Sequence, residues 1–232
     1  MGVFRFKQFS VDDSRSAMKV GTDGVLLGAW VSLCGSEAHI LDVGTGSGVI
    51  ALMLAQRTAD SVIVGIDIDE PSVEDARENF GRSPWAGRMA AFCTDFTQMR
   101  QFPYELIVSN PPYFVNSLKA PDGRRSDARH TDTLSFAALA RGAAANTSPG
   151  GRLAVVLPCE EGEIFRREAL EAGFHLRRIC RVRTTPRQPF KRSLMEFSKK
   201  EGELLEEQLT IQNSSDFTGQ YKSLTQNYYL KF

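Results

Sequence analysis

The sequence predicts an α/β protein whose central sheet is doubly wound and mostly parallel, with helices on both faces. Apolar, strand-like runs at residues 39–43, 62–66 and 104–108 alternate with segments of helical periodicity, a pattern typical of parallel sheets with crossover helices. A glycine-rich turn, Gly44-Thr45-Gly46-Ser47-Gly48, joins the first of these strands to a helix. Such a turn lets the backbone come close to a ligand at the edge of a parallel sheet.

Length and composition indicate a single globular domain. The chain has 232 residues, of which 42% are hydrophobic and 24% charged, and its formal net charge is zero, so any basic surface must be local. We expect one domain over residues 1–232, in which residues 1–36 form an N-terminal extension of a strand and a helix. No apolar run approaches the roughly 20 residues of a membrane span, and no signal-peptide core is present. These absences favour a cytoplasmic protein.

The cysteines predict neither disulfides nor a metal site. Four cysteines (Cys34, Cys93, Cys159 and Cys180) are scattered and form no CxxC pair, and three lie in or beside apolar runs, so we interpret them as reduced thiols. The sequence does not determine an oligomeric state; we expect a monomer.

The N-terminal segment leads toward the glycine-rich turn. Residues 4–9 alternate apolar and basic side chains, as an edge strand does. The run from Lys19 to Gly24 precedes a short helix, which Thr22 or Asp23 can cap. Alternatively, Lys19, Thr22 and Asp23 fold over a ligand that the next segment holds. Both interpretations stay open.

The glycine-rich turn is the first candidate ligand site. Gly44, Gly46 and Gly48 can bring the backbone and the free N–H groups at the start of the helix over residues 49–57 close to a ligand. Their spacing is GxGxG with Asp42 two residues before the first glycine, which departs from the GxGxxG of dinucleotide-binding proteins.

Acidic residues end the next two strands. The strand over residues 62–66 ends in Asp67, where a carboxylate suits the two hydroxyls of a ribose. Asp69 is expected to cap a helix over residues 71–80. The strand over residues 89–94 ends in Asp95-Phe96, an acid and a ring that could hold an adenine. Each acid could instead cap a helix, but acids at the ends of successive strands, Asp42 included, favour a nucleoside site.

The strand over residues 104–108 ends in the stiff corner Ser109-Asn110-Pro111-Pro112-Tyr113. The two prolines restrict φ, and Pro111 pushes Asn110 toward extended geometry. Asn110 and the Pro111 carbonyl offer two acceptors for the two N–H groups of an exocyclic amine, and Tyr113 offers a ring on which a base can stack. A rigid structural turn with a surface tyrosine is the alternative.

Taken in order, Asp42 to Gly48, Asp67, Asp95 and Asn110 to Tyr113 resemble the S-adenosylmethionine-dependent methyltransferases that act on exocyclic or amide nitrogens. This resemblance implies a Rossmann-like, doubly wound class I methyltransferase sheet of seven mostly parallel strands, one of them antiparallel. It also implies S-adenosyl-L-methionine as cofactor. The residues that we expect to bind this cofactor are Lys19, Thr22, Asp23, Asp42, Gly44, Gly46, Gly48, Asp67, Asp95, Phe96 and Asn110.

Further runs are similar to the bacterial tRNA1(Val) (adenine-37 N6)-methyltransferases over nearly the whole chain. They are Phe6 to Phe9, Ala17 to Gly24, Leu52 to Arg57, Ser83 to Ala86 and the closing Tyr228-Tyr229-Leu230. The resemblance implies a tRNA substrate and assigns Asn110, Pro111, Pro112 and Tyr113 to catalysis. Positioning of the amine against the sulfonium, rather than a metal or a strong base, would provide most of the catalysis, and the proton would leave to water.

The second half of the chain continues the α/β pattern and carries two basic segments. We expect a helix over residues 133–146, a strand over 153–157, a helix over 160–172 and a strand from 174 to 183. We also expect a C-terminal helix, over 217–230, that packs on the sheet. Seven Arg or Lys and no acid lie between residues 177 and 192, and a second basic cluster lies in a loop over 117–131. The candidate RNA-binding residues are Arg124, Arg125, Arg129, Arg181, Arg183, Arg187, Lys191 and Arg192.

The basic segment over residues 177–192 could instead be a solvated strand pair with a flexible loop. The acids over residues 201–207 are expected to lower the net charge without contacting the basic face.

Three alternative functions stay open. The Asn-Pro-Pro-Tyr corner fits a glutamine amide equally well, as in the methyltransferases of peptide release factors, but only about 40 residues precede the glycine-rich turn, too few for their helical domain. A guanine N2 methyltransferase is the second, although such enzymes more often have Phe at the position of Tyr113. A catalytically silent RNA-binding module is the third, and intact Asn110 and glycines argue against it.

Overall fold

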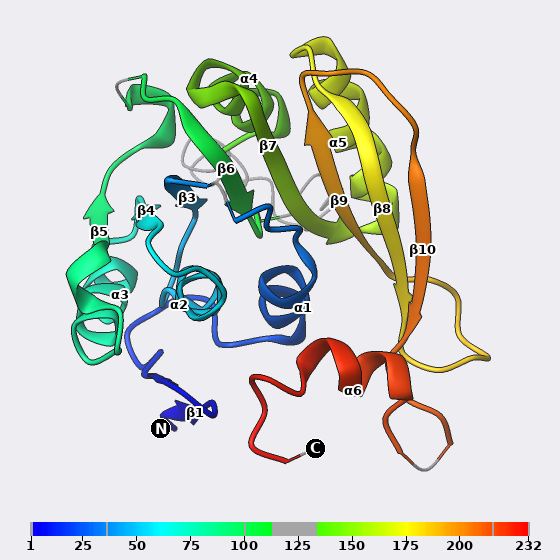
Figure 1. The fold of residues 1–232 in the computed structure, drawn as a ribbon, viewed down its shortest axis with the longest axis horizontal. Helices are drawn as coiled ribbons and strands as arrows, with labels where there is room; N and C mark the ends of the chain where they lie inside the picture. Colours follow the sequence, from blue (N-terminus) through cyan, green and yellow to red (C-terminus); the bar gives the residue numbers. More distant parts are fainter. Residues whose placement is uncertain (1, 36, 100, 113–133, 215, 232) are drawn as a thin grey trace, which may run out of the picture.

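The computed structural model describes residues 2–35, 37–99, 101–112, 134–214 and 216–231. Its centre is a sheet of eight strands with helices on both faces (Figure 1). In spatial order the strands are β10 (Leu205–Thr210), β8 (His175–Arg183), β9 (Arg192–Ser198), β7 (Thr147–Pro158), β6 (Tyr104–Ser109), β3 (His39–Val43), β4 (Val62–Asp67) and β5 (Met89–Cys93). In this sheet β9 alone runs antiparallel, to both β7 and β8.

The doubly wound, mostly parallel sheet with one antiparallel strand is confirmed, but the predicted count of seven strands is wrong. The eighth strand is β10, which pairs in parallel with β8 at the edge of the sheet. Five of its six residues are exposed or half-buried, and Leu209 is its buried one. An edge strand with one buried side chain has no apolar run or clear alternation to reveal it.

Two layers of helices cover the sheet, and each layer has its own core. The helices are α1 (Thr22–Trp30), α2 (Val49–Arg57), α3 (Glu70–Gly81), α4 (Phe136–Asn146), α5 (Cys159–Glu171) and α6 (Gly219–Thr225), with short 3-10 turns η1 (Ala86–Arg88) and η2 (Phe96–Gln98). Side chains of α1, α2, α3 and α6 share one core, and those of α4 and α5 share the other. Successive residues of β3 serve opposite faces, since Ile40 lies in the first core and Leu41 in the second.

The helix starts differ from several expectations. Gly21 precedes α1 and no side chain of the described residues caps this helix, so the alternative in which Thr22 or Asp23 caps it is wrong. Asp69 does cap α3, accepting a hydrogen bond from Ser72 N at 3.1 Å. Ser135 caps α4, which therefore begins later than residue 133. The strand β7 begins directly after α4, at Thr147 rather than at residue 153.

The two ends of the chain lie side by side (Figure 1). β1 (Phe4–Arg5) pairs with β2 (Ser10–Val11) in a separate two-stranded sheet. Lys7 N donates to Tyr228 O at 2.8 Å, and the Phe6 and Tyr229 rings stack at 6.1 Å. The C-terminal helix α6 is shorter than expected and packs against α1 and β10. In the described part of the chain, no helix has the length and hydrophobicity that crossing a membrane requires.

Candidate active site

The glycine-rich turn leaves open space above its backbone. Gly44, Gly46 and Gly48 all have positive φ, at 70°, 53° and 85°, where a side chain is strained. A Cβ on Gly44 or Gly46 would meet no atom of the described residues within 4 Å, whereas one on Gly48 would overlap the Phe80 ring. The first two glycines therefore allow a ligand to approach the backbone, and the third allows α2 to pack against α3.

The end of β4 holds this turn in place. Gly44 N and Thr45 N both donate to Ile66 O at 2.9 Å, and Gly46 N donates to Asp67 Oδ2 at 2.9 Å. Asp69 N donates to Asp67 Oδ1 at 3.1 Å. Each oxygen of the Asp67 carboxylate thus receives one backbone hydrogen bond and keeps further acceptor capacity for a ligand hydroxyl.

Asp42 lies below the turn and is fully buried. Its Oδ2 accepts hydrogen bonds from Thr45 Oγ1 at 2.8 Å and Ala51 N at 3.3 Å, whereas Oδ1 has no partner among the described residues. Burial raises the pKa of Asp42 to about 7, because the charged form loses its hydration. Asp42 therefore joins β3 to the turn and to the first residues of α2.

The neighbouring residues Asp95 and Phe96 have different surroundings. The exposed Asp95 carboxylate caps η2, accepting from Thr97 N and Thr97 Oγ1 at 2.8 Å each. The Phe96 side chain is buried in the core beside Gly142 of α4, so little of its ring is accessible to a ligand. The expectation that this ring lies against an adenine is therefore not supported, and Asp95 remains the candidate of this pair.

Asn110 lies directly beside the glycine-rich turn. It follows Ser109, which pairs in register with Val43, the residue before Gly44; Ser109 Oγ also donates to Val43 O at 2.8 Å. Asn110 Nδ2 lies 3.7 Å from Met18 Sδ. Asn110 Oδ1 is shielded from solvent and has no partner among the described residues, which is unusual for a buried oxygen. It is an acceptor available to a ligand N–H group. Pro111 and Pro112 follow it, and Tyr113 lies outside the described residues.

The segment before α1 lies near the same edge. Lys19 Nζ donates to Asp13 O and Ser14 O, and Val20 N donates to Asp13 Oδ2 at 2.8 Å. Thr22 is the exposed first residue of α1. A Cβ on Gly24 would lie 3.3 Å from Val49 Cγ1, so the first turn of α1 packs on the first turn of α2, next to the glycine-rich turn.

Comparisons with known proteins agree with this geometry. The family model described as Methyltransferase small domain matches residues 16–162. The chain belongs to this family. A tRNA1(Val) (adenine(37)-N6)-methyltransferase of Bacteroides fragilis is 44% identical over 98% of both chains. The Tolumonas auensis protein of that name is 43% identical over 98% of this chain and 97% of its own. The resemblance found in the sequence is thereby confirmed.

Solved structures agree on the fold. A predicted O-methyltransferase from Agrobacterium tumefaciens matches with a TM-score of 0.67 at 18% identity, over 89% of this chain and 96% of its own. A ribosomal protein L11 methylase from Lactobacillus delbrueckii subsp. bulgaricus matches with a TM-score of 0.59 at 16% identity, over 82% and 84%. This methyltransferase therefore has the fold that S-adenosylmethionine-dependent enzymes share, and the open glycine-rich turn beside Asp67 fits that cofactor.

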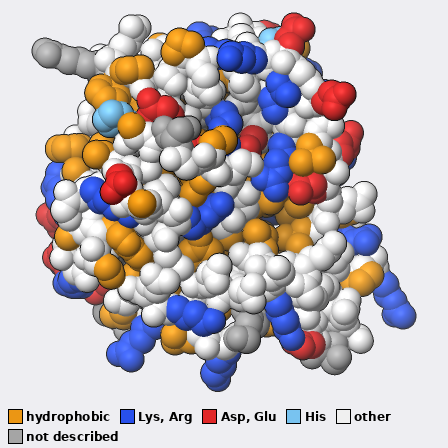
Figure 2. Space-filling model, in the orientation of Figure 1, with side chains coloured by type: hydrophobic (Ala, Val, Ile, Leu, Met, Phe, Trp, Pro, Cys, Tyr) orange, Lys and Arg blue, Asp and Glu red, His pale blue; other side chains and the backbone are white. Residues whose placement is uncertain are grey.

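Two of the four arginines on β8 are paired with acids of the neighbouring strand β10. Arg181 Nη1 lies 2.6 Å from Glu206 Oε2, and Arg178 Nε lies 2.8 Å from Glu207 Oε2. The expectation that the acids over residues 201–207 do not contact the basic face is therefore wrong. Glu206 and Glu207 lie on β10, which the sequence did not reveal as a neighbour of β8. Figure 2 shows Lys and Arg side chains interspersed with Asp and Glu on the side where these strands lie.

The remaining basic candidates differ in their surroundings. Arg183 Nε donates to Thr210 Oγ1 at 3.0 Å, and its guanidinium lies 5.0 Å from the centre of the Phe190 ring. Arg192 pairs with Asp23. Arg187 and Lys191 are exposed in the loop between β8 and β9. Three candidates, Arg124, Arg125 and Arg129, lie outside the described residues.

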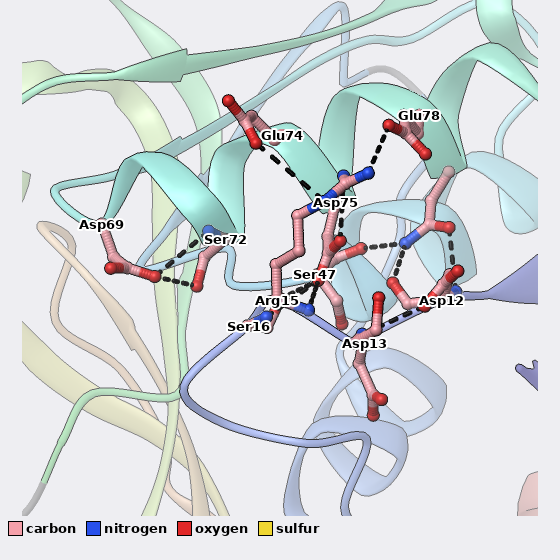
Figure 3. A network of polar contacts seen from close by, with 12 residues as sticks. Asp12, Asp13, Arg15, Ser16, Ser47, Asp69, Ser72, Glu74, Asp75 and Glu78 are labelled. Carbon is pink, nitrogen blue, oxygen red and sulfur yellow. Dashed lines mark hydrogen bonds and ion pairs between the residues drawn. The ribbon is translucent and has the colours of Figure 1, made fainter. Parts of the chain in front are cut away.

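Sequence reasoning missed a polar network beside the glycine-rich turn (Figure 3). Asp75 and Asn79 of α3 are 1% and 2% exposed, and both contact residues that precede α1. The available signal was their spacing, since residues four apart lie on one helix face, here next to the apolar Ala76 and Phe80. Among the described residues, no group of three or more His, Cys, Asp or Glu side chains could hold a metal ion.

Proposed function

We propose that this methyltransferase transfers a methyl group from S-adenosylmethionine to the N6 amine of an adenine in tRNA. The adenine proposed is adenine 37, next to the anticodon of tRNA1(Val). The observation that carries the proposal is the shielded Asn110 Oδ1 beside the glycine-rich turn, which has no partner among the residues that the structure describes. Relatives 40–45% identical over 98% of the chain have names that specify this reaction. We further propose that the enzyme acts in the cytoplasm and as a monomer.

The chain offers a coherent set of groups for the cofactor. Gly44 and Gly46 would allow its close approach, and Asp67 would accept hydrogen bonds from the ribose hydroxyls with its remaining lone pairs. Asp95 lies near the adenine end of such a site, because Thr94 N donates to Asp67 O at 2.9 Å and so joins the ends of β4 and β5. We place Lys19, Thr22 and Asp23 at the rim, where α1 begins.

The chemistry follows from the target amine. The lone pair of adenine N6 is delocalised into the ring, which makes this nitrogen a poor nucleophile. When bound, S-adenosylmethionine supplies a sulfonium whose methyl group is already a strong electrophile. Asn110 Oδ1 and the Pro111 carbonyl would accept the two N–H groups and hold the nitrogen in a geometry that suits attack.

Two further roles are the binding of the base, which we assign to Tyr113, and the acceptance of the proton, which we assign to water. Asn110 is neutral and accepts hydrogen bonds without taking the proton, which we assign to water after methyl transfer. Tyr113 would stack on the base, an interaction of about 1–3 kcal/mol. An unpaired loop adenine can enter such a site at a smaller unstacking cost than a paired one.

We also propose that tRNA phosphates contact the basic residues of the loop between β8 and β9 and those that follow Tyr113 in the sequence. The exposed Arg187 and Lys191 support this, as do Arg124, Arg125 and Arg129 by their place in the sequence after Tyr113. The pairing of Arg181 with Glu206 argues for a smaller role of that residue.

A direct assay separates this function from its alternatives. The purified enzyme would be incubated with labelled S-adenosylmethionine and, in parallel, with unmodified tRNA1(Val) or with a glutamine-containing peptide release factor. Mass spectrometry would identify the modified nucleoside or residue. N6-methyladenosine at position 37 is the expected product. N2-methylguanosine would favour a guanine enzyme, label in a glutamine-containing protein would favour an amide enzyme, and no transfer to any of these would favour a silent RNA-binding module.

A further inference from the structure

The N-terminal strap, which we define as residues 12–20, connects helix α3 to the catalytic corner. It leaves β2, runs along α3 and ends before α1. At its tip, Met18 Sδ lies 3.7 Å from Asn110 Nδ2. The strap is closed on itself, because Val20 N donates to Asp13 Oδ2 at 2.8 Å. Whatever holds the strap therefore also sets the position of Met18 beside Asn110.

Asp75 fastens the middle of the strap. Its Oδ2 accepts hydrogen bonds from Arg15 N at 2.9 Å, Ser16 N at 2.8 Å and Ser16 Oγ at 2.9 Å. Its Oδ1 accepts from Arg15 Nη1 at 3.2 Å. Figure 3 shows Arg15 and Ser16 lying against the α3 face that carries Asp75. A carboxylate with four such bonds, itself 1% exposed, fixes the strap backbone at this point.

Asn79 joins the start of the strap to the glycine-rich turn. Asn79 Oδ1 accepts from Asp12 N at 2.9 Å, and Nδ2 donates to Asp12 O at 2.8 Å and to Ser47 O at 2.9 Å. Ser47 lies between Gly46 and Gly48. One buried amide thus uses both hydrogens and its oxygen, so it cannot rotate without losing bonds to the strap and the turn together.

We infer that Asn79 is a positioning residue that transmits the arrangement of the glycine-rich turn, through the strap, to Met18 and Asn110. Because the turn is the cofactor-binding element, cofactor that orders the turn also orders the strap, and thereby prepares the site for the amine. Asp75 supports this by holding the strap on α3. The inference rests on the proposed function for the identity of the amine, but the coupling between turn and strap does not depend on it.

The coupling is tested without any turnover. Hydrogen exchange of the peptide over residues 12–20 would be followed by mass spectrometry with and without S-adenosylhomocysteine. In the wild type, bound S-adenosylhomocysteine is expected to slow exchange in the strap about tenfold or more. In Asn79→Ala the strap should exchange at nearly the same rate with and without ligand, at concentrations where calorimetry shows the ligand bound. Equal protection of the strap in wild type and Asn79→Ala would overturn the inference.

A double-mutant cycle tests the path to Asn110. If Asn79 acts through the strap, Asn79→Ala should lower kcat/KM for tRNA about tenfold, with most of the effect in kcat and little in cofactor affinity. Adding Met18→Ala to Asn79→Ala should then cost little more, because both changes disrupt one path. If instead the fold-losses in kcat/KM caused by the two changes multiply in the double variant, Asn79 contributes to general stability alone, and the inference is overturned.

Matched variants keep both tests informative. Glu70 lies on the same helix as Asn79 and forms an exposed ion pair with Arg77. Glu70→Gln should leave strap exchange and kcat/KM unchanged. Should Asn79→Ala fail to fold, Asn79→Asp keeps the acceptor for Asp12 N and loses both donated bonds, so it serves in its place. A wild type that shows ligand-dependent strap protection but methylates no tRNA would contradict the proposed function and leave this inference standing.

Discussion

Arg192 Nε donates to Asp23 Oδ2 at 2.7 Å and so joins the start of β9 to the first turn of α1. Asp23 was expected at the cofactor site and Arg192 at the RNA surface, and the structure brings the two side chains together. They are 23% and 29% exposed, so the pair is partly shielded from solvent. The loop between β8 and β9 is thereby tied to the helix that begins beside the glycine-rich turn.

This pair should make a modest contribution to stability. A double-mutant cycle with Asp23→Ala and Arg192→Ala is expected to give a coupling of about 0.5–1 kcal/mol in the free energy of unfolding, the upper part of the range for partly exposed pairs. Urea unfolding of the four proteins measures it. The same cycle on Arg166 and Glu163, an exposed pair within α5, should give a smaller value; equal couplings would show that shielding adds nothing.

Asp67 should contribute directly to cofactor affinity. Replacing it by Ala removes the acceptor for the ribose hydroxyls and the hydrogen bond from Gly46 N. We expect Asp67→Ala to weaken S-adenosylmethionine binding by about 1.5–3 kcal/mol, the range for hydrogen bonds to charged groups. Isothermal titration calorimetry checks this, with thermal unfolding as the control for folding. Unchanged affinity in a folded variant would remove Asp67 from the site.

Asn110 should act mainly in the transition state. If its Oδ1 orients the amine, Asn110→Ala will lower kcat far more than it weakens cofactor binding. Single-turnover assays with tRNA, alongside calorimetry with S-adenosylhomocysteine, separate the two effects. Wild-type turnover in this variant would mean that the corner is only a structural turn.

The buried Asp42 should make stability depend on pH. Its pKa is about 7 in the folded protein, above the ordinary 3.8, so the folded state binds this proton more tightly than the unfolded state. The contribution of Asp42 to stability is therefore full below about pH 4 and is lost as the pH rises toward 7. Relative to wild type, Asp42→Asn should show a flatter decline of Tm between pH 5 and 7.5. Parallel curves for the two proteins would argue against a raised pKa.

Salt dependence tests the RNA surface. If the basic loop residues contact phosphates, tRNA affinity should fall with salt, each contact adding about −0.7 to the slope of log K against log salt for a single strand. Replacing Arg124 and Arg125 by Ala should flatten the slope and leave cofactor affinity intact. Arg187→Ala should have a larger effect than Arg181→Ala, because Arg181 is already paired with Glu206. A flat slope for the wild type would contradict RNA binding and favour the amide substrate.

The sequence by itself determined the elements whose signals are local. Gly44, Gly46 and Gly48 occupy alternate positions in one short turn, and their positive φ values are a property that glycine alone adopts easily. Asp67 ends β4 and Asn110 directly follows β6, and the carboxyl ends of parallel strands meet at one edge of a sheet. Apolar runs and their spacing therefore predicted the parallel strands β3, β4 and β6, the turn and the acceptor at the corner, but they did not reveal the edge strand β10.

The tertiary structure decided what depends on neighbours distant in the chain. From the sequence, Phe96 was predicted to be an accessible ring beside an acid, but α4 covers it. From the sequence, Arg181 was predicted to be a cation available to RNA, but the edge strand β10 places Glu206 beside it. Asn79 reads as an ordinary helix residue, but it bonds Asp12, 67 positions away, and Ser47, 32 positions away. Local patterns record backbone preference and burial, whereas the partner of a polar side chain is set only when the packed elements bring distant segments together.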